Sequence, residues 1–155
     1  MDAGEQKALD DIATHGCHII NVLAEGEQPE FSYSVGIQQS TQRPEAIVIG
    51  LKHPIAMFVI NEYNSRLKAG ETFAVGKFYS GFIEGFDCYI EQVHKKHYRE
   101  YFGWDIWLYK GTDFEVIQFV YPSTQGIWPW DNESTGWFKN WQPILTENGK
   151  PTIAT

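Results

Sequence analysis

The first apolar pattern along the chain is helical. Over residues 4–15, Leu9 and Ile12 recur at helical spacing while charged side chains occupy the opposite side. Gly16 follows directly, and glycine is the residue that most often ends a helix in the left-handed conformation. The pattern therefore predicts an amphipathic helix over residues 4–15.

Three strands are expected next. Residues 31–37 alternate large apolar with small residues, which is typical of a strand. Residues 17–23 predict a strand with apolar residues on both faces, and residues 46–51 predict a fully buried strand. The polar residues 38–44 between two of these strands predict a loop.

A second main helix is predicted over residues 54–68. Pro54 is suited to the first helical turn, and Gly70 ends the pattern. Residues 72–93 indicate two or three shorter strands, and residues 94–102 a short helix.

The remaining sequence is rich in aromatic residues. Residues 104–109 and 114–121 predict the two strands of a hairpin joined by a turn. From Pro122 onward the chain has no clear period, so we expect an irregular segment.

These elements indicate one α+β domain over residues 1–155. The predicted strands outnumber the helices and do not alternate with them, which favours a mainly antiparallel sheet or small barrel over a doubly wound fold. Two main helices and one short helix are expected to flank it. A chain of 155 residues with 43% hydrophobic residues has enough apolar material for one core.

Charge narrows the classes of function. The net charge is −8, so the clustered cations that follow a phosphate backbone are lacking and nucleic-acid binding is disfavoured. Residues 1–30 hold seven carboxylates and one lysine. This stretch is either a well-solvated helix face followed by an acidic turn, or a negative field that steers a basic partner.

The N-terminus does not resemble a secretion signal, and the longest apolar runs are too short to cross a bilayer. We therefore expect no membrane association and a cytoplasmic location. Cys17 and Cys88 are the two cysteines, and their spacing does not indicate a disulfide framework.

The sequence motifs of common enzymes are missing, including phosphate-binding loops and paired metal-ligand motifs. His94 and His97 lie three residues apart on the predicted short helix, but no third or fourth ligand is specified, so we predict no metal site. Cys17 and His18 are adjacent and point to opposite faces of a strand, so they do not form a nucleophile–base pair. No catalytic residue is predicted.

Two features have both a structural and a functional interpretation. His53 precedes Pro54 where a strand meets a helix, so it is either a turn residue or a functional group at a helix N-terminus. All six tryptophans fall within residues 104–141, and the pair Trp128 and Trp130 lies in the irregular segment. Tryptophans there either anchor the segment on the sheet or contact a ligand or partner.

Several stretches together resemble a known family. His15-Gly16, Phe31–Ile37 and Pro44–Leu51 are similar to the N-terminal signature of the domain-of-unknown-function family DUF4262. Gln118–Pro122 and Gly126–Asp131 are similar to its C-terminal signature. Because that family is functionally uncharacterised, the resemblance implies a shared α+β fold and no particular reaction.

The first functional hypothesis is a non-enzymatic acidic binding protein, specifically an immunity or antitoxin-like inhibitor of a bacterial toxin. An acidic surface would speed association with a basic toxin, and buried aromatic side chains would supply affinity. The contacts we expect are those of Asp10, Asp11, Glu25, Glu27, Trp128 and Trp130.

The alternative hypothesis is a small-molecule-binding domain or enzyme for a nucleotide or flavin. Its pocket would include Tyr33, His53, Gln118, Trp128, Trp130 and Asp131, beside the small side chains of Ser34 and Gly36. Aromatic rings would stack on the ligand, Gln118 would donate or accept hydrogen bonds, and His53 or Asp131 would move protons. The sequence specifies neither the cofactor nor the oligomeric state.

Overall fold

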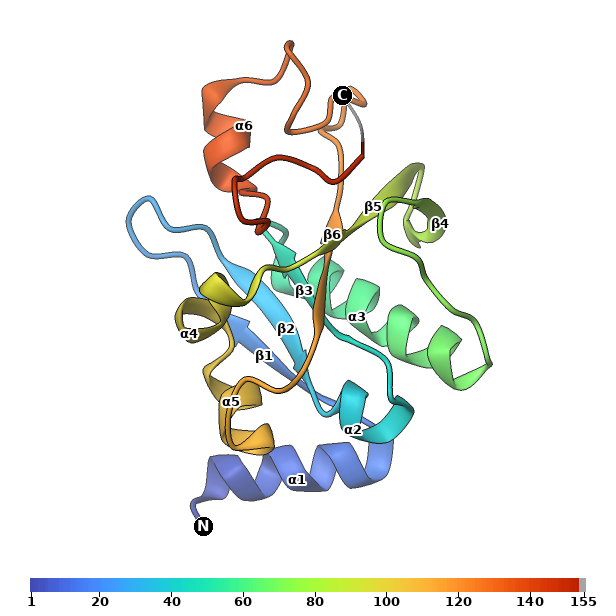
Figure 1. Cartoon of the computed structure of the whole chain (residues 1–155), viewed down its shortest axis with the longest axis vertical. Coiled ribbons are helices and arrows are strands. Elements are labelled where there is room, and N and C mark those ends of the chain that lie inside the picture. The colour runs from blue at the N-terminus through green and yellow to red at the C-terminus, as the bar shows by residue number, and fades with distance from the viewer. Residues whose placement is uncertain (154–155) are drawn as a thin grey trace.

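The computed structural model describes residues 1–153 (Figure 1), and it confirms the α+β class. The elements in chain order are α1 (Ala3–His15), β1 (His18–Val22), β2 (Phe31–Val35), α2 (Ile37–Thr41), β3 (Glu45–Ile49), α3 (His53–Lys68), β4 (Phe78–Ile83), β5 (Phe86–Gln92), the 3₁₀ turn η1 (Lys95–His97), α4 (Tyr98–Tyr101), α5 (Gly103–Tyr109), β6 (Val116–Val120) and α6 (Gly136–Trp141).

The six strands form one open sheet in the order β1-β2-β3-β6-β5-β4. Neighbouring strands are antiparallel, except that β3 and β6 run parallel. The mainly antiparallel sheet is therefore confirmed. The barrel alternative is wrong, because β1 and β4 are edge strands and do not pair with each other.

The strand directions bring several connections to one end of the sheet. Strands β3 and β6 both finish there because they are parallel. The β1–β2 and β4–β5 turns lie at the same end, since Val22 pairs with Phe31, Phe31 with Ile49, and Tyr89 with Val120. We call this the carboxyl end of the sheet.

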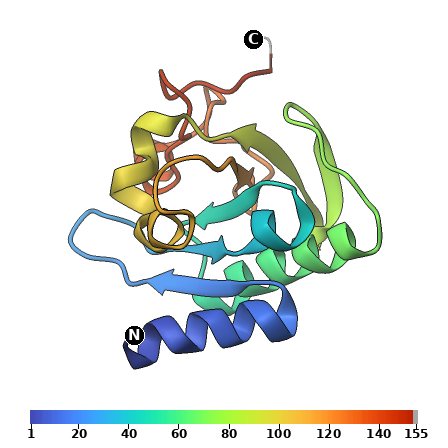
Figure 2. The same ribbon diagram turned by 60° about the horizontal axis from the view of Figure 1, so that its bottom comes forward.

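Both faces of the sheet are covered. Helix α3 packs on one face, where its Val59, Ile60 and Tyr63 join the core formed by β3, β5 and β6. On the other face, Tyr98 and Phe102 pack with the side chains of β2 and β3. Figure 2 shows α1 running alongside β1 at the margin of the sheet.

The two main helices were predicted within one residue at each end. In α1, the Asp2 carboxylate accepts the backbone N–H of Glu5 while the Glu5 side chain accepts that of Asp2. Gly16 ends the helix at φ +90°. Helix α3 begins with Pro54 in its first turn.

The helix count and the second hairpin were predicted wrongly. Residues 1–153 contain six α-helices rather than three, because α2, α5 and α6 form in segments expected to be loop, strand and irregular chain. Residues 104–109 lie in α5. A short, mostly apolar segment fits a helix or a strand equally well, and here these residues form a helix that packs against Tyr33 and its neighbours.

Within the described residues, no helix is both long and apolar enough to span a membrane.

Candidate functional site

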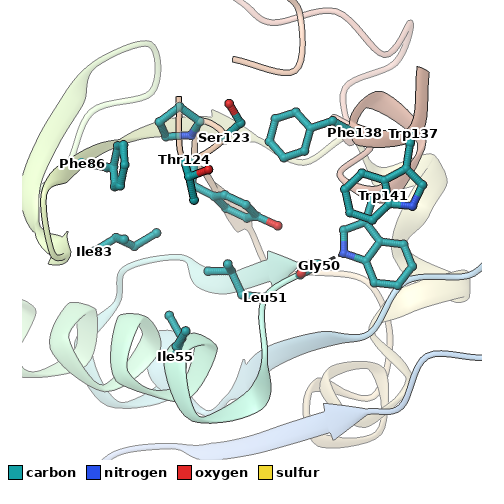
Figure 3. A pocket seen from close by; sticks show the side chains of 12 residues that line it. Gly50, Leu51, Ile55, Ile83, Phe86, Ser123, Thr124, Trp137, Phe138 and Trp141 are labelled. Atoms are coloured by element: carbon teal, nitrogen blue, oxygen red, sulfur yellow. Dashed lines mark hydrogen bonds between the residues drawn. The ribbon is translucent and has the colours of Figure 1, made fainter. Parts of the chain in front are cut away.

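A pocket of about 410 Å³ lies at the carboxyl end of the sheet (Figure 3). Its floor comes from the residues that follow β3 and β6, one side from the start of α3 and the β4–β5 hairpin, and the other from α6. We call it the sheet-end pocket. It is lined by Gly50, Leu51, Ile55, Ile83, Phe86, Tyr121, Pro122, Ser123, Thr124, Trp137, Phe138 and Trp141.

Gly50 allows Tyr121 and Trp141 to pack closely against the end of β3 on the pocket floor. It has φ +89°, and a Cβ atom there would lie 2.6 Å from the Tyr121 hydroxyl and 2.8 Å from Cδ1 of Trp141. The Tyr121 hydroxyl donates to the carbonyl of Ile49 at 2.7 Å, and Nε1 of Trp141 donates to that of Gly50 at 2.9 Å. The end of β3 thus satisfies the polar atoms of both rings, and their apolar surfaces are left to line the pocket.

Two stacked indoles form one rim of the pocket. Trp137 and Trp141 are four residues apart on α6, which places them on the same side of the helix. Their ring centroids lie 5.4 Å apart with planes inclined by 13°. Trp137 remains 66% exposed, an unusual position for so large an apolar side chain.

The apolar surface continues beyond the pocket along α3. Ile55 lines the pocket and is 46% exposed, and Phe58, one turn further along the helix, is 55% exposed. Figure 3 shows Ile55 below Leu51, facing the cavity from α3. An apolar pocket bordered by exposed apolar side chains is typical of a binding surface.

The lining of the sheet-end pocket carries hydroxyls and no charged side chain. Burial raises the pKa of Tyr121, and the nearby charge of Glu30 raises it further, so the phenol stays protonated. An uncharged, aromatic lining of this kind suits binding through shape and apolar contact more than proton transfer.

The predicted acidic residues separate into two groups. Asp10 and Asp11 lie on α1, at the opposite end of β1 from Glu25 and Glu27 in the β1–β2 turn. A hydrogen bond with His18 at 2.7 Å is the main influence that lowers the pKa of Asp11. Of these four residues, Glu27 lies beside the sheet-end pocket, where it lines a hollow with Trp137 and Trp141.

The residues of the predicted small-molecule pocket are not brought together. Tyr33 is buried on the α5 side, where its hydroxyl oxygen accepts the backbone N–H of Trp104 at 3.1 Å. His53 begins α3, with Nε2 3.2 Å from the carbonyl of Val22. Gln118 is buried in β6 and bonds the backbone of Pro143 and Leu145 at 2.8 and 2.9 Å.

The small side chains beside Tyr33 leave no opening for a ligand. Ser34 donates to the buried carboxylate of Glu45 at 2.7 Å. Gly36 is in close contact with Ile12, because a Cβ atom at Gly36 would lie 2.7 Å from Cγ1 of that side chain. The space is therefore filled by α1.

Trp128, Trp130 and Asp131 act together as an anchor for the tail. The two indoles stack at 5.2 Å with planes 9° apart, and the Asp131 carboxylate accepts the backbone N–H of Trp128 at 2.8 Å. Their rings contact Phe78 and Tyr89 of the β4–β5 hairpin. This arrangement corresponds to the interpretation in which the two tryptophans anchor the irregular segment on the sheet.

The aromatic residues of α6 were missed by the sequence reasoning. A signal was present, because Thr135 is a good N-cap residue and Trp137 and Trp141 follow at a four-residue spacing. In the structure the Thr135 hydroxyl accepts the backbone N–H of Phe138 at 3.0 Å.

Neither cysteine is placed to react. Cys17 and Cys88 are buried free thiols, and burial raises the pKa of each to about 12. A thiol with such a pKa is almost entirely protonated at neutral pH and is a poor nucleophile.

The histidine pair binds backbone atoms. Nδ1 of His94 accepts the N–H of Lys96, and Nε2 of His97 lies 2.9 Å from the carbonyl of Thr146. Across residues 1–153, no group of three or more histidine, cysteine or acidic side chains is arranged to hold a metal ion.

Two carboxyl groups are buried away from any pocket described above. Glu45 accepts hydrogen bonds from the N–H groups of Gly36, Ile37 and Gln38 and from two hydroxyls, so it caps the N-terminus of α2. Asp105 in α5 is fully buried, and both its oxygens lack a hydrogen-bond partner. Burial raises the pKa of Asp105 well above its ordinary value, and the charge of Glu45 adds to this effect.

Taken together, the geometry defines an α+β protein with an open six-stranded sheet and an aromatic pocket at one end. The chain belongs to the family described as a domain of unknown function, DUF4262, whose model matches residues 11–135. No curated protein and no solved structure shows significant similarity to it. The family match ends directly before α6, so it includes the floor of the sheet-end pocket but not the tryptophan rim.

Proposed function

We propose that this chain is a binding protein that holds a protein partner in the cytoplasm without catalysing a reaction. The observation that carries the proposal is the exposed Trp137, stacked on Trp141 beside an apolar pocket. Tryptophan is among the residues that most often dominate binding energy at protein interfaces. The exposed Ile55 and Phe58 extend the apolar surface beyond the size needed for a small ligand.

The finer form of this proposal is an immunity or antitoxin-like inhibitor that covers a basic bacterial toxin. A net charge of −8 supports it, because opposite charge speeds the encounter with a basic protein. Glu25 and Glu27 are the predicted acidic contacts that lie at the same end of the sheet as the pocket.

Co-expression with the adjacent reading frame tests this function. We expect that frame to encode a toxic product, and the wild-type chain to relieve the toxicity and co-purify with the product. Trp137→Ala should weaken the complex about thirtyfold, which corresponds to a loss of about 2 kcal/mol. Leu23→Ala is the matched control, because Leu23 is also exposed but does not line the pocket. A harmless neighbouring product with nothing co-purifying would count against the inhibitor role.

A second candidate is a small-molecule-binding domain, which the volume of the sheet-end pocket favours. About 410 Å³ lies in the range occupied by drug-sized ligands, and aromatic linings are common in such sites. A thermal-shift screen with nucleotides and flavins tests it. A shift that disappears in Trp137→Ala would support this candidate, and no shift across the panel would argue against it.

A further inference from the structure

The sheet-end pocket lies between two further hollows. A hollow of about 530 Å³ adjoins it on the side of the β1–β2 turn, where Gly26, Glu27 and Gln28 face Trp137 and Trp141. A hollow of about 490 Å³ adjoins it on the other side, between the β4–β5 hairpin and residues 122–128. Each hollow shares lining residues with the pocket, so the three lie side by side, and we call this row of hollows the furrow.

The length of the furrow follows from the order of the strands. It runs from the turn after the edge strand β1 to the turn after the edge strand β4, past the ends of β3 and β6. Five spacings of about 4.8 Å separate the two edge strands, which gives a span of about 24 Å. An extended peptide of about seven residues has this length, whereas a drug-sized molecule would fill only one hollow.

The charge of the furrow is negative at both ends. Glu27 lines the hollow at one end and Asp87 the hollow at the other, and both side chains are exposed. Among residues 1–153, no lysine or arginine lines any of the three hollows. The ion pairs found within residues 1–153 do not involve Glu27 or Asp87. They join Asp11 to Lys7 and His18, and Glu71 to Arg66. The carboxylates of Glu27 and Asp87 are therefore both available to a cation.

We propose that the furrow binds one extended peptide segment of the partner, with a large apolar side chain in the sheet-end pocket and a basic residue on each side of it. This inference rests on the proposed function and adds the chemistry of the bound segment. The apolar side chain would contact Trp137, Phe138 and Leu51. The two basic side chains would reach Glu27 and Asp87, and a cation near Glu27 would also be close to Trp137 and Trp141, whose aromatic rings attract cations.

Selection of a random heptapeptide display library on the full chain tests the proposal. We expect enriched peptides to carry a large apolar residue at the centre and lysine or arginine towards both ends. Trp137→Ala should abolish the enrichment. A selected peptide should bind more weakly as the salt concentration rises, because salt screens exposed charge pairs.

Charge-neutralising variants give the matched comparison. Glu27→Gln and Asp87→Asn should each weaken binding of a selected peptide about two- to fivefold, the range expected for an exposed ion pair. Glu84→Gln removes the same charge from the neighbouring β4–β5 turn without lining the furrow, and it should leave binding unchanged.

Three outcomes would overturn the proposal. The first is enrichment of neutral or acidic peptides, and the second is equal effects of the lining and control variants. The third is a selection with no enrichment over Trp137→Ala. If Trp137→Ala still disrupts the complex with the co-expressed partner while any of these occurs, only the peptide chemistry fails. If that variant leaves the complex intact, the site in the proposed function fails.

Discussion

The side chain of Gln142 pairs with both backbone groups of Tyr121. Its Oε1 accepts the N–H of Tyr121 at 3.0 Å, and its Nε2 donates to the carbonyl of the same residue at 2.9 Å. Gln142 is fully buried and directly follows α6. These two hydrogen bonds hold the tryptophan rim against the floor of the sheet-end pocket. They satisfy the backbone of Tyr121 as a neighbouring strand would, one residue beyond the end of β6.

Gln142→Leu should therefore destabilise the protein. The substitution replaces the amide with an apolar side chain of similar size and leaves the two buried backbone groups of Tyr121 without partners. We expect the free energy of unfolding to fall by about 2–4 kcal/mol. Urea denaturation followed by tryptophan fluorescence measures it. A change below about 0.5 kcal/mol would mean that α6 is held by other contacts.

Gly50→Ala tests the close approach of the two rings on the pocket floor. Alanine is strained at φ +89°, and its Cβ atom would clash with Tyr121 and Trp141. Gly70→Ala is the control, because Gly70 has φ +96° with no atom within 4 Å of the added Cβ. We expect Gly50→Ala to cost at least about 1 kcal/mol more than the control, as overpacked sites do. If thermal or urea unfolding gave equal losses of stability for the two variants, Tyr121 and Trp141 would have moved to accommodate the added Cβ atom.

Asp105→Asn should stabilise the protein as the pH rises. Burial raises the folded-state pKa of Asp105, so the unfolded chain releases this proton first, from about pH 4 upward. In the wild type, stability from this group is complete below that pH and is lost as the pH climbs towards the folded-state pKa. Asparagine carries no such proton and avoids the loss.

We expect the variant to exceed the wild type by about 1–3 kcal/mol at mildly alkaline pH, with the gap narrowing towards pH 4. Urea unfolding across that pH range measures the difference. Asp10→Asn removes an exposed carboxylate from α1 and should change little. A gap for Asp105→Asn that stays constant with pH would show that its carboxyl ionises equally in both states.

The two thiols should react only when the protein unfolds. Cys17 and Cys88 are 5% and 0% exposed, and burial raises the pKa of each to about 12. With a disulfide reagent at neutral pH, we expect the native chain to label no faster than its global unfolding rate. Rapid labelling of one thiol in the native protein would instead mark it as an accessible nucleophile.

The sequence predicted the elements whose signals are local. Helices α1 and α3 have capping residues and long apolar periods, and β2 alternates clearly, so each was found within about two residues. Helix α5 was missed because its seven residues are mostly apolar, and the sheet face beneath it determines its conformation.

The candidate site was harder to predict because it is formed by contacts between distant segments. Gly50 and Trp141 meet across 91 positions of sequence. Glu27 and Trp128 were predicted as contacts and both line the furrow, and Trp128 together with Trp130 also anchors the tail on the β4–β5 hairpin. No period or spacing distinguishes an anchoring tryptophan from one at the rim of a pocket.

The tail after β6 contributes no strand to the sheet, yet it supplies the tryptophan rim. A helix as short as α6 does not persist in water on its own, so the rim exists only while the tail is docked. The shape of the binding surface is thus coupled to the docking of the tail, which also places Ile144 and Leu145 in the core. A protease that cuts within residues 122–135 would release the constraint that holds the rim, and an occupied furrow would slow that cleavage.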